Sequence, residues 1–267
     1  MMSSPLRYLF PKNCIFCGKS LSVGERIDIC GECSPNIPYF AGRYLFECGS
    51  ARSDNYCDRI VCALKYTDFV RSALSGYKFH DRREFGPTLA ALLCERITRV
   101  EGGMRGEKTD LEAAVAAVRQ SYDFITCVPL SRTRLRERGY NQAAIIAGYA
   151  ARYFGLPHRA KLLTRAEDTL RQSALRRAER QANVQTAFRA DTATALKLRA
   201  YARARARTPV QAQAPEQGAQ NDAVLSGARI ILIDDIATSM STINACAAAL
   251  KAQGAAMVLG AVLAAPP

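Results

Sequence analysis

The chain of 267 residues carries 37 Lys and Arg against 24 Asp and Glu, a formal net charge of +13, and 49% of its residues are hydrophobic. This size and apolar fraction suit one sizeable α/β domain with appendages, and the basic excess favours partners that carry phosphate. The first residues lack the apolar core of a signal peptide, and the longest late apolar run is too short for a membrane span. We therefore expect a cytoplasmic protein rather than a secreted or membrane-spanning one.

The first predicted element is a small metal-binding module over residues 1–45. Two Cys-x2-Cys pairs lie there, separated by twelve residues, at Cys14, Cys17, Cys30 and Cys33. Each pair presents two sulfur atoms from one tight turn, and four thiolates form the ligand set of a closed structural Zn²⁺ site. The other cysteines are scattered, which indicates reduced thiols rather than a disulfide framework. The spacing of Cys48, Cys57 and Cys62 does not make two clean pairs, so we assign them no ligand role.

The main domain is predicted over residues 58–267, and it opens with a strand that leads into helices. Apolar residues recur there at helical spacing, first at Val70, Leu74 and Tyr77 and later at Leu89, Leu92 and Leu93. Lys78 and Phe79 come at the end of the first helical pattern. A Lys in such a place is usually solvated, and we leave Lys78 out of the predicted site.

An insertion near residues 101–121 follows, Gly-rich and charged at its start and ending in a short Ala-rich helix. The run from Phe124 to Val128 predicts a buried strand that Pro129 ends. We expect an Arg-rich loop after it, closing on Gly139, whose missing side chain would let backbone N–H groups approach an anion. The stretch "NQAAIIAGYAARYF" then predicts a helix.

Two hydrophilic segments come next. Residues 169–188 lack early periodicity, which suits either a mobile lid over a site or a polar helix. An insertion near residues 190–226 is rich in Ala, Arg, Gln and Pro, and we expect part of it to be disordered.

The last predicted unit is the strand, loop and helix of "RIILIDDIATSMSTINACAAALKAQGA". Ile230 to Ile233 read as a parallel strand buried on both faces, with Asp234 and Asp235 at its carboxyl end. The small hydroxylated residues up to Thr242 precede a helix N-terminus, which suits a phosphate. The two carboxylates then suit sugar hydroxyls or Mg²⁺, so the unit as a whole favours a phosphorylated ribose. The alternative is that the pair merely caps the following helix.

Four stretches together resemble the ComF competence-protein family and, more widely, the type I phosphoribosyltransferases. They are the paired cysteines, "CVPLSRTRLRERGYNQAAIIA", "TLRQSALRRAERQANVQTAF" and "RIILIDDIATSMST". The resemblance implies a type I phosphoribosyltransferase-like parallel sheet with flanking helices, preceded by the zinc module. It also implies binding of phosphoribosyl pyrophosphate with Mg²⁺.

The resemblance assigns roles to residues of this chain. Asp234 and Asp235 would be catalytic, holding the ribose hydroxyls directly or through Mg²⁺. The 5′-phosphate would lie on Thr238, Ser239, Met240, Ser241 and Thr242, although the family usually has Gly where Met240 stands. Pyrophosphate would meet Arg138 and Gly139, and the flexible loop would contribute Gln172, Arg180 and Asn183.

Three functions remain open at this point. The first is an enzyme, a phosphoribosyltransferase with an acceptor that cannot be read from the sequence. The second is a non-catalytic module that binds single-stranded DNA within the DNA-uptake machinery of natural transformation. In the basic stretch from Arg159 to Arg207, only Phe188 and Tyr201 offer aromatic rings for stacking bases. The third is a sensor that binds the ligand without turning it over.

Overall fold

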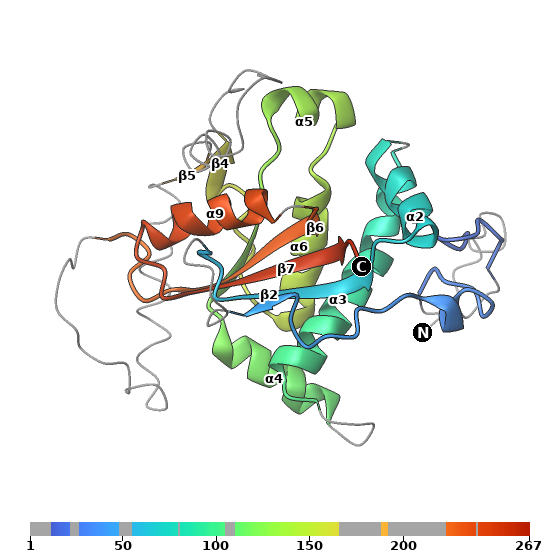
Figure 1. Cartoon of the computed structure of the whole chain (residues 1–267), viewed down its shortest axis with the longest axis horizontal. Coiled ribbons are helices and arrows are strands. Elements are labelled where there is room, and N and C mark those ends of the chain that lie inside the picture. Colours follow the sequence, from blue (N-terminus) through green and yellow to red (C-terminus); the bar gives the residue numbers. More distant parts are fainter. Residues whose placement is uncertain are drawn as a thin grey trace.

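The computed structural model describes residues 12–21, 27–47, 55–79, 81–104, 110–165, 188–191, 223–238 and 240–267. Its centre is a five-stranded sheet with the order β1-β2-β7-β6-β3 (Figure 1). The strands are β1 (Phe46–Glu47), β2 (Arg59–Lys65), β3 (Phe124–Cys127), β6 (Arg229–Ile236) and β7 (Met257–Ala265). All neighbours pair in parallel except the short edge strand β1, which runs antiparallel to β2. A second sheet pairs β4 (Leu163–Arg165) with β5 (Phe188–Ala190).

Helices flank both faces of the main sheet. The α-helices described are α2 (Asp68–Phe79), α3 (Gly86–Glu101), α4 (Leu111–Ser121), α5 (Arg132–Arg138), α6 (Gln142–Phe154) and α9 (Ser241–Lys251), with 3₁₀ turns at Ser34–Asn36 and Arg83–Phe85. Helices α3 and α6 cover one face, while α9 lies against the other (Figure 1). The predicted parallel sheet with flanking helices is confirmed.

Alternating residues of β6 pack into two separate hydrophobic cores. Ile231 and Ile233 pack on the side of α3 and α6, whereas Ile230 and Leu232 pack on the side of α9. All four side chains are fully buried. This double burial is what the continuous apolar run predicts for a central parallel strand.

The sequence analysis missed the strand β7, which lies between β2 and β6 and is buried along almost its whole length. Its residues are mostly Ala, Val, Leu and Gly, a composition that by itself does not distinguish a strand from a helix. Gly260 shows why small residues occur here. A Cβ atom at this position would lie 3.0 Å from Ile243 and 3.1 Å from Ile60, so the strand fits only because its side chains are small.

The Arg-rich segment after β3 was predicted as a loop, and this prediction is wrong, because the segment forms the helix α5. Ser131 caps the start of this helix, its hydroxyl accepting a hydrogen bond from the Arg134 N–H at 3.3 Å. Gly139 ends the helix in a left-handed conformation with φ of 72°. The segment therefore carries both a start and a stop signal for one short helix.

The cysteine module packs into the core on the α3 side. Phe16, within the first cysteine pair, stacks on Phe69 of α2 with ring centroids 4.5 Å apart. Cys14, Ile15 and Ile29 belong to the same cluster of buried residues as this part of α2. The module thus supports the helix that leads to Lys78. Within the described residues, no helix combines the length and the apolar composition needed to cross a lipid bilayer.

Candidate functional site

The four cysteines of the N-terminal module come together as predicted. Their Sγ atoms all lie within 4.8 Å of one another. Gly18 turns the first pair with φ of 75°, its N–H donating to the Cys14 carbonyl at 2.9 Å, and the Cys30 N–H donates to the Cys14 sulfur at 3.4 Å. Four converging sulfurs with N–H groups directed at them fit a metal such as Zn²⁺.

The thiols of this cluster differ in acidity. Burial raises the pKa of Cys14, but the backbone N–H groups of Cys17, Cys30 and Phe16 outweigh it and lower the pKa to about 7. Burial and the neighbouring thiols raise the pKa of Cys33. A metal would displace the protons that remain on the sulfurs, so its binding would depend on pH. Cys57 and Cys62 are buried in the core on the α9 side, and Cys48 lies outside the described residues.

The acidic pair lies at the carboxyl end of β6, as predicted. Asp235 forms an ion pair with Lys78 of α2, Oδ2 to Nζ 2.9 Å, and only 13% and 15% of the two side chains are exposed. Burial, followed by the charge of Asp235, raises the pKa of Asp234 to about 8. The environment of Asp234 therefore favours its protonated form, while Asp235 is balanced by Lys78.

The alternative that the two carboxylates cap α9 is wrong. Asp234 accepts a hydrogen bond from the Asp235 N–H at 2.8 Å, and Asp235 accepts one from the Ile236 N–H at 2.6 Å. The residue at the N-terminal cap of α9 is Met240, whereas Asp234 and Asp235 both lie within β6. Both carboxylates thus belong to the end of the strand.

Met240 has a left-handed backbone with φ of 57°, where the family usually has Gly. A Met in this conformation is strained, because its Cβ atom meets a steric cost that Gly avoids. Asp81 is the other non-glycine residue with positive φ in the described part of the chain, at 52°. Of the remaining predicted phosphate contacts, Thr238 and Ser241 are exposed and Thr242 is half-buried, while Ser239 lies outside the described residues.

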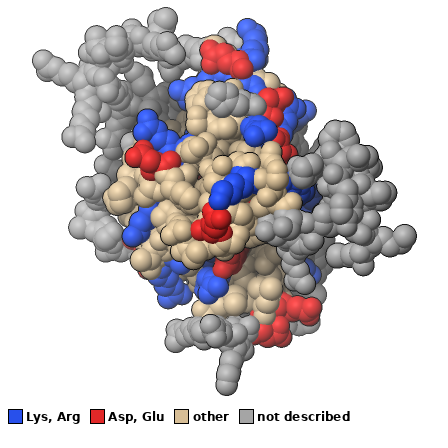
Figure 2. Space-filling view, turned by 90° about the vertical axis from the view of Figure 1, so that its right-hand side faces the viewer, with Lys and Arg blue, Asp and Glu red and all other residues tan. Residues whose placement is uncertain are grey.

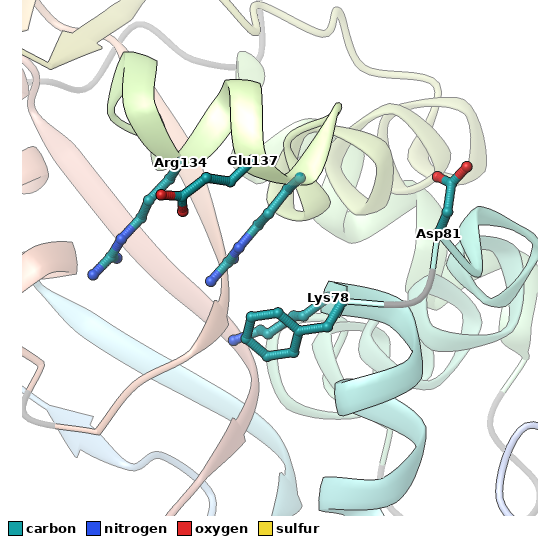
Figure 3. Close-up of a pocket in the computed structure, with 6 residues that line it drawn as sticks. Lys78, Asp81, Arg134 and Glu137 are labelled. Carbon is teal, nitrogen blue, oxygen red and sulfur yellow. The ribbon is translucent and has the colours of Figure 1, made fainter.

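A cavity of about 290 Å³ opens between α2 and α5, and we call it the α2–α5 cleft. Its lining residues are Lys78, Phe79, Asp81, Arg134, Glu137 and Arg138. In Figure 3, Arg134 and Glu137 extend from α5 and Lys78 from α2, and the nitrogen ends of Lys78 and Arg134 point the same way. Three cations and two carboxylates thus line the cleft, and Lys78 connects it to the end of β6 through Asp235; the excess of cations suits an anion.

Arg138 is the predicted pyrophosphate contact that lies in this cleft. Its guanidinium lies over the ring of Phe79, 5.2 Å from the centroid, and donates to Oε1 of Gln142 at 3.2 Å. The second predicted contact needs correction, because the Gly139 N–H already donates to the Leu135 carbonyl at 2.9 Å as part of the helix end. Gly139 shapes the turn, and Arg138 provides the charge.

Sequence reasoning missed Lys78. The signal was the Lys-aromatic pair at the end of a helical pattern, which we interpreted as a solvated helix end. The structure instead brings Lys78 to Asp235, which is 157 positions further along the chain (235 minus 78). Gln172, Arg180 and Asn183, predicted for the flexible loop, lie outside the described residues.

Charge on the surface is mixed where the described residues can be seen. Figure 2 shows Lys and Arg side chains interspersed with Asp and Glu across the face that contains the N-terminal part of the fold. No continuous basic field covers the described residues of this face. The cations that line the α2–α5 cleft therefore indicate an anion-binding site more specifically than the net charge of the chain does.

The chain was compared with known proteins. No protein-family model matches it. It is 26% identical over 246 residues to the DNA utilization protein YhgH of Salmonella typhi, covering 92% of this chain and 86% of that protein. It is 23% identical over 242 residues to the competence protein F of Haemophilus influenzae, covering 90% and 85%. These findings support a ComF-family protein. The resemblance to the ComF family that the sequence motifs indicate is confirmed.

One solved structure, described as the structure of the allosteric regulatory enzyme of purine biosynthesis, also matches. The match has a TM-score of 0.36 and 15% identity, and covers 71% of this chain but 30% of that structure. A likeness at this level carries no argument about the site.

Proposed function

We propose that this ComF-family chain binds phosphoribosyl pyrophosphate with Mg²⁺ beside the end of β6, and that it acts in the cytoplasm during the use of DNA taken up in natural transformation. The main observation in favour of this ligand is the Lys78–Asp235 ion pair next to the α2–α5 cleft. It joins a cation suited to pyrophosphate with a carboxylate suited to ribose hydroxyls or Mg²⁺. The names of the relatives support the setting.

Each part of the ligand would contact residues of suitable charge. Arg138, Arg134 and Lys78 would hold the pyrophosphate oxygens from two helices, and Asp234 and Asp235 would hold the ribose hydroxyls. The loop before α9 would hold the 5′-phosphate with its hydroxyls and N–H groups. Mg²⁺, when bound, would neutralise part of the pyrophosphate charge. The ligand would also separate Lys78 from Asp235 by offering each a new partner.

We propose transfer chemistry for this site. The bond between the ribose C1 and the pyrophosphate oxygen would break, the electron pair would leave with pyrophosphate, and C1 would form a bond to the acceptor. Lys78 and Arg138 would stabilise the negative charge that develops on the leaving oxygen. The alternative is a non-catalytic module that binds single-stranded DNA or senses the ligand. Phe188, predicted as a stacking ring for DNA, is only 5% exposed, which weakens that form of the alternative; Tyr201 lies outside the described residues.

Calorimetry of the full chain with phosphoribosyl pyrophosphate and Mg²⁺ tests the proposal. Replacing both carboxylates, Asp234→Asn with Asp235→Asn, should weaken binding at least about a hundredfold, because the contacts to ribose and metal are lost together. Arg138→Ala should weaken it about tenfold. Arg136→Ala is the matched control, since Arg136 is exposed on the same helix and does not line the cleft. It should stay within about twofold of the parent.

Two outcomes would contradict the proposal. If the parent chain does not bind phosphoribosyl pyrophosphate, the proposed ligand is wrong. If the double carboxylate variant binds like the parent, the proposed site is wrong. Release of pyrophosphate in the presence of candidate acceptors would distinguish an enzyme from a sensor. Anisotropy of a labelled single-stranded oligonucleotide, measured on the same variants, would show whether DNA uses the same residues.

A further inference from the structure

Two neighbouring amides begin helix α6, and they differ in how they are used. Asn141 caps the helix, its Oδ1 accepting from the Ala144 N–H at 3.3 Å, while its Nδ2 donates to the Val128 carbonyl at 3.0 Å. Both ends of this side chain therefore stabilise the fold. Asn141 needs no further role to explain it.

Gln142 is different, because its amide is only half satisfied. Its side chain is buried, with the residue 1% exposed, and its Oε1 accepts from Nη1 of Arg138 at 3.2 Å. Its Nε2 makes no well-aligned hydrogen bond among the described residues, although the side chain lies close enough to the Tyr140 hydroxyl to oppose the rise in pKa that burial gives to this group. A buried donor without a partner costs free energy, and an apolar side chain of the same shape would avoid that cost. The stability of the fold therefore does not explain why an amide stands here.

The geometry around Arg138 explains it. Arg138 is half-buried, whereas the other arginines of α5 are exposed. The oxygen of Gln142 holds its guanidinium, which lies over the ring of Phe79, a side chain that is 65% exposed. A guanidinium has only donors, so an uncharged acceptor can orient it without neutralising its charge. A carboxylate in the same place would compete with an anionic ligand.

The backbone of Gln142 is itself fixed. The Tyr77 hydroxyl donates to the Gln142 carbonyl at 3.0 Å, and the Tyr140 hydroxyl donates to the Tyr77 carbonyl. Gly139 turns the chain between α5 and α6 with a left-handed backbone, and this turn brings Gln142 back to Arg138. The backbone of Gln142, which carries the Oε1 acceptor, is thus anchored to the end of α2, the helix that also contains Lys78.

We propose that Gln142 is a positioning residue, whose Oε1 holds the Arg138 guanidinium over Phe79 so that its charge is ready for the anion in the α2–α5 cleft. This role rests on the proposed function of the cleft. An arginine fixed before binding loses less conformational freedom when the ligand arrives, which favours affinity. Gln142 itself does not need to contact the ligand.

The first test is the replacement Gln142→Met, which keeps the size of the side chain and removes the acceptor. The affinity for phosphoribosyl pyrophosphate should fall about fivefold to tenfold, while Tm should stay equal or rise because the unpartnered donor is gone. In an Arg138→Ala background the same change should cost less than about twofold. An equal loss in both backgrounds, or a loss of affinity that follows a loss of Tm, would mean that Gln142 is merely structural.

The second test does not depend on the ligand. Phenylglyoxal modifies accessible arginines, and peptide mass spectrometry of the full chain compares Arg138 with Arg136 as an internal reference. Gln142→Met should raise the ratio of Arg138 to Arg136 labelling about threefold or more, because the guanidinium is released. Gln142→Glu, which keeps an acceptor oxygen, should leave the ratio at the parent value. An unchanged ratio in Gln142→Met overturns the positioning role, whereas a parent that fails to bind phosphoribosyl pyrophosphate overturns only the proposed function.

Discussion

The cysteine cluster and the α2–α5 cleft handle charge in opposite ways. The four sulfurs lie together in one short segment that is anchored to α2 through Phe16, and three of the four cysteines are buried while Cys17 is exposed. The cleft is lined by cations from α2 and α5 and by the carboxylates of Asp81 and Glu137, and its Lys78 is paired with Asp235 at the end of β6. A closed centre stabilises a fold, while an open and partly balanced one is suited to exchange partners.

The largest effect of a mutation is expected at the cysteine cluster. Changing Cys14→Ser together with Cys30→Ser should abolish stoichiometric zinc, which we expect at one ion per chain, and destabilise the protein by several kcal/mol, because structural zinc contributes directly to folding. Metal analysis and thermal unfolding measure the two effects. Cys94→Ala serves as the control, since Cys94 is buried in α3 and is not one of the four clustered cysteines, so this variant should keep the zinc of the parent. Loss of zinc without any loss of stability would show that the cluster is not a structural centre.

A smaller effect is expected from Asp234. Its pKa in the folded state, about 8, lies above the ordinary value of 3.8, so between these values the folded chain holds a proton that the unfolded chain has lost. The free energy of unfolding should therefore fall as pH rises through this window, the reverse of a normal salt-bridged Asp. Asp234→Asn keeps the acceptor for the Asp235 N–H and removes the titration.

The measurement is unfolding by denaturant at pH 6 and pH 8 on both proteins. Between these values the parent should lose about 1–2 kcal/mol relative to Asp234→Asn. Titrations elsewhere, including that of Cys14, are shared by both proteins and cancel in the difference. Parallel pH profiles for the two proteins would show that Asp234 is ionised already at pH 6.

Local patterns in the sequence predicted more than long-range assembly. The cysteine spacing, the buried run Ile230 to Ile233 and the helix after Thr242 each carry their own signal within a few residues. The Lys-aromatic pair at Lys78 did not reveal its partner, because Asp235 is brought to it by the pairing of β2, β7 and β6 rather than by the chain nearby. β7 was missed since small residues fit a crowded sheet centre without a distinctive period. Short helical stretches such as α5 depend on caps that were not weighed against the Arg-rich composition.

The smallest expected effect concerns Met240, in the loop before α9. Met240 has φ of 57°, packs against the core on the α9 side and directly precedes α9. Gly adopts this conformation at no steric cost, whereas Met loses on the order of 1 kcal/mol. Met240→Gly should therefore tighten binding of ribose 5-phosphate about fivefold to tenfold, as measured by calorimetry.

Ribose 5-phosphate is the right probe because it lacks pyrophosphate and reports on the loop before α9 alone. Asp81→Gly is the matched control, since Asp81 has a similar left-handed backbone with φ of 52° but lines the α2–α5 cleft instead. It should relieve comparable strain and raise Tm slightly without changing the affinity for this probe. If Met240→Gly binds ribose 5-phosphate no better than the parent, the packing of Met240 against the core matters more than its strain.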